Sequence, residues 1–311
     1  SIKPYINLTP LLECNKELQK FFNTNLFLKY EIFQKSGSFK ARGAINNILS
    51  FKKKKITKGI TAVSAGNHAI AASYAANLFK LQNKIFLYKS ANKYRVDICK
   101  NYNANIIFTD TENAFDNVKS AEAEGYFFVH PFDGPKTLQG SATIGLELTN
   151  YFDEINKKID NVIISVGGGG LISGIGSYIK QIYPNAKIIG VEPDGAKGLT
   201  DSLINKKPID KIKVSSIADS LCAPIHMPYS FSVASKVIDQ MVTVSDKQMI
   251  EFMIFAYENL KLFLEPACVA GLAAIKYKFS EKLVNQNTIV ILCGSNIDHQ
   301  TWRKYLLTWN I

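Results

Sequence analysis

Residues 161–182 read NVIISVGGGGLISGIGSYIKQI. A short apolar strand runs into four consecutive glycines, at 167–170, and a helical pattern follows. Glycine lets backbone N–H groups converge on an anion, and a helix start adds the positive end of its dipole. A tight strand–helix turn is the simpler alternative, but such a turn rarely needs four glycines. The stretch therefore predicts a phosphate site, and it matches neither the GxGxxG dinucleotide motif nor a P-loop.

Similar strands and helices alternate along the rest of the chain. Eight apolar runs of strand length are bounded by turn residues, at 25–33, 59–65, 84–90, 104–110, 125–131, 161–167, 187–193 and 287–294. Seven other segments have helical spacing, at 39–49, 68–78, 95–101, 114–124, 141–151, 171–182 and 247–259. Near-continuous apolar strands that alternate with helices predict an α/β fold with mostly parallel sheets.

A lysine stands at the start of one of these helices, in the segment QKSGSFKARGA at 34–44. Ser38 is expected to cap the helix, which puts Lys40 in the first helical turn. The helix dipole and nearby cations would then lower the pKa of the Lys40 amine. A neutral lysine amine can form a Schiff base. Taken alone, a lysine in this position is more often an ordinary surface residue.

Two further strand ends carry small or reactive residues. The segment SAGNH at 64–68 leads from a strand into a helix and predicts a second anion site, suited to a carboxylate. In the alternative, Asn67 only caps the helix. The segment CGSN at 293–296 places the Cys293 thiol at a strand end, where ligands bind in α/β sheets. A buried structural cysteine is the alternative there.

Composition limits the other classes of function. The chain has 311 residues, of which 47% are hydrophobic, so it can build a large core. No apolar run is long enough for a membrane helix. The formal net charge is +11, but the one dense basic run, Lys52 to Lys55 with Lys58, lacks aromatics and is expected to be a solvated helix end. Five separated cysteines without a CxxC pair favour a reducing cytoplasm over a disulfide framework or a zinc site.

Together these segments resemble the fold-type II pyridoxal-phosphate enzymes, specifically the branch of serine/threonine dehydratases and serine racemases. The resemblance covers nearly the whole chain, in order. It is carried by TPL (9–11), GSFKARGA (37–44), SAGNH (64–68), GGGG (167–170), VEP (191–193), IAD (217–219), EPA (265–267) and CGSN (293–296). Each motif supplies a different part of one cofactor site, so the ordered set is more specific than any single motif.

This resemblance implies an architecture and a cofactor. The expected fold is the two-domain, tryptophan synthase β-like fold, with pyridoxal 5'-phosphate bound between the domains. Residues 1–52 and 138–311 would form the large cofactor-binding domain. Residues 53–137 would form the small domain.

The resemblance also implies roles for individual residues. Lys40 would form the Schiff base with the cofactor and later remove the α-proton of the substrate. The other cofactor contacts would be Phe39, Asn67, Gly167, Gly168, Gly169, Gly170, Leu171 and Cys293. The substrate contacts would be Ser64, Ala65, Asn67 and His68. A mono- or divalent cation would be bound by Glu192 and the carbonyl of Ala196, near Gly198. Ser141 stands where many members of the family have a glutamine near the substrate.

The activity implied by the resemblance is α,β-elimination from L-serine, L-threonine or a related β-hydroxy amino acid such as hydroxyaspartate, to a 2-keto acid and ammonia. A serine racemase or another β-eliminating lyase is the alternative. Racemisation needs a second proton donor opposite Lys40. The similar serine racemases have a serine there, and this chain has Ala65. A non-catalytic amino-acid-binding protein is the third hypothesis, against which the intact Lys40 argues. We expect a cytoplasmic homodimer without a nucleic-acid or membrane partner.

Overall fold

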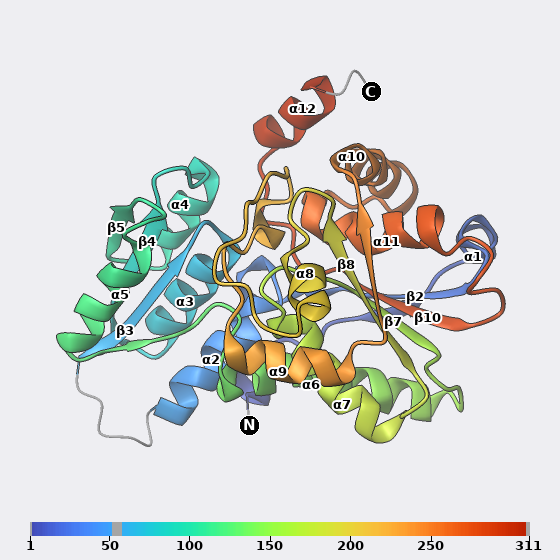
Figure 1. Ribbon diagram of the computed structural model, residues 1–311, viewed down its shortest axis with the longest axis horizontal. Helices are drawn as coiled ribbons and strands as arrows, with labels where there is room; N and C mark the ends of the chain where they lie inside the picture. Colours follow the sequence, from blue (N-terminus) through green and yellow to red (C-terminus); the bar gives the residue numbers. More distant parts are fainter. Residues whose placement is uncertain (1, 52–57, 309–311) are drawn as a thin grey trace.

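The computed structural model describes residues 2–51 and 58–308, and its larger sheet has six strands in this described part. In spatial order they are β1 (Leu11–Glu13), β2 (Asn25–Lys29), β10 (Asn287–Ile291), β7 (Asn161–Ser165), β8 (Lys187–Pro193) and β9 (Gln240–Val244). Neighbouring strands are parallel except β1, which pairs antiparallel with β2. The sheet therefore joins strands from both ends of the chain (Figure 1).

A smaller sheet uses only residues 59–128. Its strands are, in spatial order, β5 (Ile106–Thr109), β4 (Gln82–Tyr88), β3 (Gly59–Ser64) and β6 (Tyr126–Phe128), and all neighbours are parallel. The helices between them are α3 (Asn67–Leu78), α4 (Lys93–Asn101) and α5 (Ala114–Ala123). Both α3 and α5 pack on β3, which explains why five of its six residues are buried.

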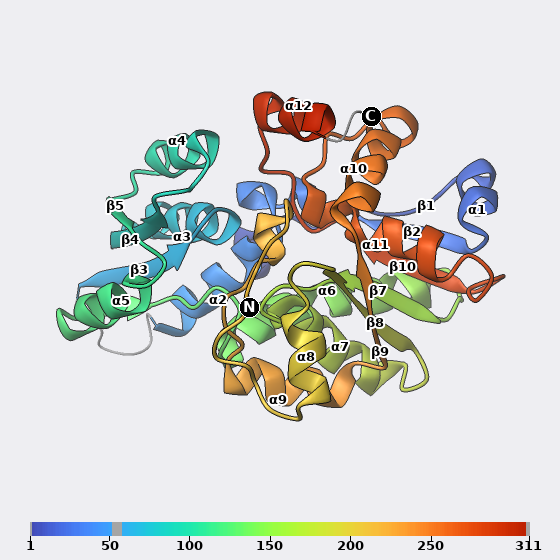
Figure 2. The same cartoon turned by 45° about the horizontal axis from the view of Figure 1, so that its top comes forward.

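Helices cover both faces of the larger sheet. On one face lie α10 (Asp246–Phe255) and α11 (Pro266–Lys278). On the other lie α6 (Pro135–Glu154), α7 (Gly170–Ile182) and α9 (Pro228–Val237), as Figures 1 and 2 both show. The remaining α-helices of the described residues are α1 (Lys16–Phe22), α2 (Lys40–Phe51), α8 (Gly198–Ile204) and α12 (His299–Thr308). Because both faces are covered, β7 is buried at all five positions.

One helix, α2, connects the two sheets. It contacts α6, which packs on the larger sheet, and α3, which packs on the smaller sheet. Its apolar side chains Ala41, Ala44, Ile45 and Ile48 are buried in a core that includes much of α3. The start of α2, with Lys40, therefore lies at the junction of the two sheets.

The predicted α/β fold with mostly parallel sheets is confirmed, and all eight predicted strands are present. The prediction missed the strands β1 and β9, and it missed the helices α1, α8, α9, α11 and α12. The edge strand β9 is only partly buried along most of its length, so it lacks a continuous apolar run. By contrast, α11 has ten buried residues and is apolar nearly all round, so it lacks the periodicity of a surface helix.

The fold leaves two of the predictions untested. The basic run from Lys52 to Lys55 lies outside the described residues. The domain boundaries stay a prediction, and the one at 137/138 falls in the first turn of α6. Within residues 2–51 and 58–308, no helix is both long and apolar enough to span a membrane.

Candidate active site

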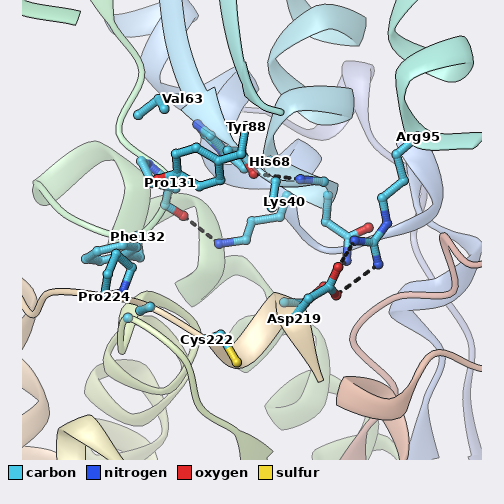
Figure 3. A pocket seen from close by; sticks show the side chains of 17 residues that line it. Lys40, Val63, His68, Tyr88, Arg95, Pro131, Phe132, Asp219, Cys222 and Pro224 are labelled. Atoms are coloured by element: carbon cyan, nitrogen blue, oxygen red, sulfur yellow. Dashed lines mark hydrogen bonds and ion pairs between the residues drawn. The ribbon is translucent and has the colours of Figure 1, made fainter. Parts of the chain in front are cut away.

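Lys40 is the first residue of α2. The backbone N–H of Phe39 donates to the carbonyl of Cys293 at 3.1 Å, which fixes this segment to the end of β10. The Lys40 amine donates to the carbonyl of Pro131 at 2.6 Å (Figure 3). Burial lowers the pKa of the amine to about 8, against the opposing effect of the Cys293 sulfur. About a tenth of the amine is then neutral at pH 7, against well under a thousandth for an ordinary lysine.

The cause of this low pKa differs from the predicted one. Burial is the largest cause, and the sequence did not predict it. The predicted Ser38 cap is wrong, because the Ser38 hydroxyl is buried and has no partner among the described residues. The Ser38 carbonyl, not the hydroxyl, accepts the hydrogen bond from the Ala41 N–H. A buried hydroxyl without a partner is rare in folded proteins.

The glycine run lies between β7 and α7 and packs closely on Phe132. A Cβ atom on Gly168 would lie 2.2 Å from the Phe132 ring, and one on Gly170 would lie 2.5 Å from the Phe132 carbonyl oxygen. Gly169 has a φ of +86°, in the left-handed region that favours glycine. Close approach and backbone turning therefore both require glycine here. The run leads directly into the 13-residue helix α7.

Ser165, the last residue of β7, carries no distinguishing signal in the sequence. Its hydroxyl is buried without a hydrogen-bond partner in the described part of the chain. It lines a cavity of about 40 Å³ together with the glycine run, Lys40 and Cys293. An unpaired hydroxyl beside a helix N-terminus suits an anion, which can accept bonds from both.

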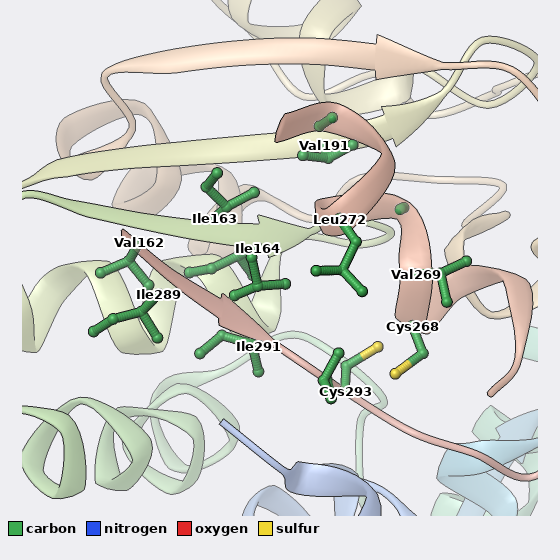
Figure 4. Close-up of a cluster of buried hydrophobic side chains, with 14 of the residues drawn as sticks. Val162, Ile163, Ile164, Val191, Cys268, Val269, Leu272, Ile289, Ile291 and Cys293 are labelled. Carbon is green, nitrogen blue, oxygen red and sulfur yellow. The ribbon is translucent and has the colours of Figure 1, made fainter. Parts of the chain in front are cut away.

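Cys293 is buried two residues after the end of β10. Its thiol donates to the carbonyl of Ala267 at 3.8 Å, and its sulfur faces that of Cys268 (Figure 4). The hydrogen bond with Cys268 and burial raise the pKa of Cys293 well above its ordinary value. The thiol is therefore uncharged at physiological pH.

The segment from Ser64 to His68 turns from β3 into α3. The Ser64 hydroxyl accepts a hydrogen bond from the Gly66 N–H at 3.0 Å. The alternative in which the Asn67 side chain caps α3 is wrong. That side chain instead donates to Glu265 at 2.7 Å and to Ser220 at 3.2 Å. It is thereby bonded to two segments of the larger unit.

His68 is buried, and its Nε2 lies 2.7 Å from the carbonyl of Val129. This ring nitrogen therefore carries a proton and donates it to the carbonyl. Burial and the charge of Lys40 lower the pKa of His68 to about 3, so the ring is neutral. A neutral ring does not attract a carboxylate by charge. The predicted contact between His68 and the substrate thus depends on the backbone N–H at the start of α3.

Arg95 of α4 links the two sheets through one partly exposed and one buried ion pair. Its guanidinium donates to both carboxylate oxygens of Asp219, which starts the 3-10 helix η4 (Asp219–Leu221). It also donates to Glu265 at 3.3 Å and to the carbonyl of Asn296 at 2.7 Å. These three partners belong to the IAD, EPA and CGSN motifs. Arg95 itself resembles a surface residue in the sequence, because polar and charged residues surround it.

Lys40 lines three cavities, of which the third measures only about 10 Å³. The larger of the other two, about 110 Å³, is lined by residues 64–68, Arg95, Asp219 and several apolar side chains. The smaller is the cavity of the glycine run and Cys293. Lys40, Asn67 and Gly168 line both. An anion at the glycine run and a carboxylate at residues 64–68 would therefore lie on either side of one amine.

The predicted cation ligand Glu192 is bonded to donors in the first turn of α8. Its carboxylate accepts hydrogen bonds from the backbone N–H groups of Leu199 and Thr200 and from the Thr200 hydroxyl, at 2.6–2.9 Å. Burial raises the pKa of Glu192 to about 7. Among the described residues, no group of three or more His, Cys, Asp or Glu side chains could hold a metal ion. The site at Glu192 and Ala196 stays a prediction.

Other proteins are similar to this chain in sequence and in structure. The family model described as "Pyridoxal-phosphate dependent enzyme" matches residues 2–294. A phenylserine dehydratase from Ralstonia pickettii is 36% identical over 307 residues, which are 98% of this chain and 93% of that protein. Maize serine racemase superposes with a TM-score of 0.90 at 31% identity, over 99% of this chain and 94% of that one. A threonine deaminase from T.th. superposes with a TM-score of 0.88 at 29% identity, over 96% and 95%.

Proposed function

Because the chain belongs to the family of pyridoxal-phosphate-dependent enzymes, we propose that it is a dehydratase that converts a β-hydroxy amino acid into a 2-keto acid and ammonia. The observation that carries the proposal is the buried Lys40 amine, with the glycine run on one side and residues 64–68 on the other. Two of the similar proteins are a dehydratase and a deaminase by name.

The residues around Lys40 fit pyridoxal 5'-phosphate. The N–H groups of Gly167, Gly168, Gly169, Gly170 and Leu171 would hold the phosphate at the start of α7. The unpaired Ser165 hydroxyl in the same cavity would add a further donor. The Lys40 amine would bond to the aldehyde carbon. The Phe39 ring, whose centroid lies 5.0 Å from that amine, would pack beside the cofactor.

Asn67 and Cys293 would contact the ring of the cofactor. The Asn67 amide makes a long bond to Ser220, at 3.2 Å, which the ring hydroxyl would replace. Asn296 donates to the Asn67 Oδ1 at 2.7 Å and fixes the orientation of that amide. The Cys293 thiol would face the ring nitrogen. Because this thiol is uncharged, it supports a cofactor with an unprotonated ring nitrogen.

The bound cofactor supplies an electron sink for the charge left on the substrate when its α-proton is removed. Lys40 removes that proton, since its lowered pKa lets the amine accept one at neutral pH. The backbone of residues 64–68, at the start of α3, holds the substrate carboxylate. Neutral His68 fixes this segment through its bond to Val129. The β-hydroxyl leaves as water, and hydrolysis of the released enamine consumes one water and gives the keto acid and ammonia.

The pKa of Lys40 predicts how cofactor attachment depends on pH. Only the neutral amine attacks the aldehyde, so the attachment rate should rise about tenfold per pH unit below pH 8 and level off above it. The measurement is the rate of visible absorbance change when cofactor-free protein is mixed with pyridoxal 5'-phosphate between pH 6 and 10. A rate that keeps rising to pH 10 would indicate an ordinary lysine and contradict the burial effect.

Ala65 distinguishes a dehydratase from a racemase. Its methyl group lines the larger cavity but exchanges no proton, so we expect keto acid and very little D-isomer from an L-substrate. Introducing Ala65→Ser should raise the ratio of racemisation to elimination at least about tenfold, because the hydroxyl supplies the missing proton donor. Ala65→Gly is the matched control, since it changes the same position without adding a hydroxyl. Chiral chromatography and a keto-acid assay measure the two products.

A substantial yield of D-isomer from the unmodified protein would assign the far-face proton to another residue. The chain would then be a racemase, which is the alternative that its likeness to maize serine racemase supports. The general test of the proposed function is a keto-acid assay of the purified holoprotein with L-serine, L-threonine and β-hydroxyaspartate. If the protein turned over none of these substrates and no other β-hydroxy amino acid, the dehydratase proposal would be refuted.

Three further properties are proposals of the same kind. We propose the domain division at residues 1–52 and 138–311 against 53–137, which the separate origin of the two sheets supports. We propose a homodimer, to be measured by sedimentation. We propose a cytoplasmic location, which the five free cysteines support.

A further inference from the structure

The larger cavity beside Lys40 has a polar and an apolar side. Residues 64–68 and the Arg95–Asp219 pair form the polar side. The apolar side consists of Val63, Tyr88, Pro131, Phe132, Ala223 and Pro224. Figure 3 shows the Lys40 amine between these sides, with Arg95 and Asp219 to its right and Phe132 and Pro224 to its left.

The polar side chains are already paired within the protein. Arg95 is bonded to Asp219, Glu265 and Asn296, and His68 is bonded to Val129. On the apolar side, the side-chain polar atoms are the Tyr88 hydroxyl and the neighbouring Cys222 thiol, whose pKa burial raises to about 11. Burial raises the pKa of Tyr88, so that hydroxyl stays uncharged. A carboxylate that entered this side would find no cationic side chain among its own residues.

The positions of the other substrate groups direct the β-substituent to the apolar side. The carboxylate is held at residues 64–68, and the amino group is held where the Lys40 amine meets the glycine-run cavity. The β-carbon carries the leaving hydroxyl and one further group, which is hydrogen in serine and methyl in threonine. Neither of these covers a wall with two aromatic rings and two prolines. This cavity measures about 110 Å³, which is more than a hydrogen or a methyl group fills.

We propose that the preferred substrates are β-hydroxy amino acids with an aromatic or similarly large apolar β-substituent, which packs between Tyr88 and Phe132. This inference rests on the proposed dehydratase function and names its substrate class. Such a substituent removes apolar surface from water on both sides of the contact. A β-carboxylate is excluded, because burying a charge without a partner is strongly unfavourable. Hydroxyaspartate should therefore be the poorest of the candidate substrates.

The first test compares substrates of the holoenzyme. We expect kcat/KM for β-phenylserine to exceed that for L-threonine at least about tenfold, since one methylene in an apolar pocket is already worth about 10- to 200-fold. L-serine and β-hydroxyaspartate should follow in that order. A second readout does not depend on elimination. L-Phenylalanine, which lacks the β-hydroxyl, should inhibit at concentrations at least about tenfold lower than L-alanine.

The second test changes the wall. Tyr88→Ser should lower the ratio of kcat/KM for β-phenylserine to that for L-threonine at least about fivefold, because it removes an aromatic ring from the wall. Tyr88→Phe keeps the ring and should retain the ratio. Tyr257→Ser, at an exposed tyrosine outside the cavity, is the matched control for the substitution itself.

The outcomes separate this inference from the function on which it rests. Faster turnover of L-threonine or L-serine than of β-phenylserine would overturn the substrate class and leave the dehydratase function standing. A preference for β-phenylserine that Tyr88→Ser leaves intact would overturn the assigned wall. Absence of keto acid from all four substrates would refute the proposed function, and the substrate class would fall with it.

Discussion

Replacing Lys40 with alanine is expected to lower the rate of 2-keto acid formation by about a thousandfold or more. The substitution removes both the covalent attachment of the cofactor and the base that takes the α-proton, and a positioned base alone contributes about 10²- to 10⁴-fold to the rate. The measurement is the initial rate of keto-acid formation with excess pyridoxal 5'-phosphate. Lys119→Ala is the control, because Lys119 forms only an exposed ion pair with Asp116 on α5.

The same variant should fold normally. The Lys40 amine is disfavoured in its protonated form by burial, and its side chain borders open cavities, so its loss leaves little unfilled core. The denaturation midpoint of the cofactor-free protein should stay close to that of the unmodified chain. Substantial activity in Lys40→Ala would mean that another residue removes the α-proton. Loss of folding would mean that Lys40 has a structural role.

Arg42→Ala is expected to lower the free energy of unfolding by about 3–5 kcal/mol. Lys40→Ala, by contrast, should leave the stability nearly unchanged. Arg42 lies two residues after Lys40 and is fully buried. Its guanidinium bonds to Glu31 at 2.7 and 2.8 Å and to Glu147 at 2.6 and 2.9 Å. Lys29 also bonds to Glu147 at 2.5 Å, so the cluster has two cations and two carboxylates. Without Arg42, two carboxylates would share one cation.

Urea unfolding of the cofactor-free protein measures this loss. Lys119→Ala should leave the midpoint unchanged, because exposed pairs contribute little. Arg42→Lys should fall between the two, since it retains the charge but not the paired hydrogen bonds to the carboxylates. If Arg42→Ala unfolds at the same urea concentration as the unmodified protein, the cluster does not stabilise the start of α2.

The sequence predicts the fold through its strands. Runs such as NVIIS in β7 are apolar at nearly every position because helices cover both faces of a parallel sheet, and that pattern is visible without a structure. The half-exposed edge strand β9 and the mostly buried helix α11 were missed for opposite reasons. The first has too little apolar signal, and the second has apolar residues on every side.

The candidate site was predictable where function depends on backbone geometry. Four glycines mark a place where Phe132 lies within contact distance of the main chain. The roles of Arg95 and Ser165 were not predictable, because they depend on contacts between distant segments. Arg95 meets Asp219 across 124 positions of sequence. The Ser38 cap failed for a related reason: the segment before α2 follows the end of β10 instead of closing the helix locally.

The central claim is that Lys40 carries the cofactor, and borohydride reduction tests it most directly. Reducing the holoprotein should fix the cofactor irreversibly to its lysine, and digestion followed by mass spectrometry identifies the labelled peptide. We expect the label on Lys40, whose amine lies between the two cavities and has a lowered pKa. A label on any other lysine, or no label in a protein that still forms keto acid, would contradict the account.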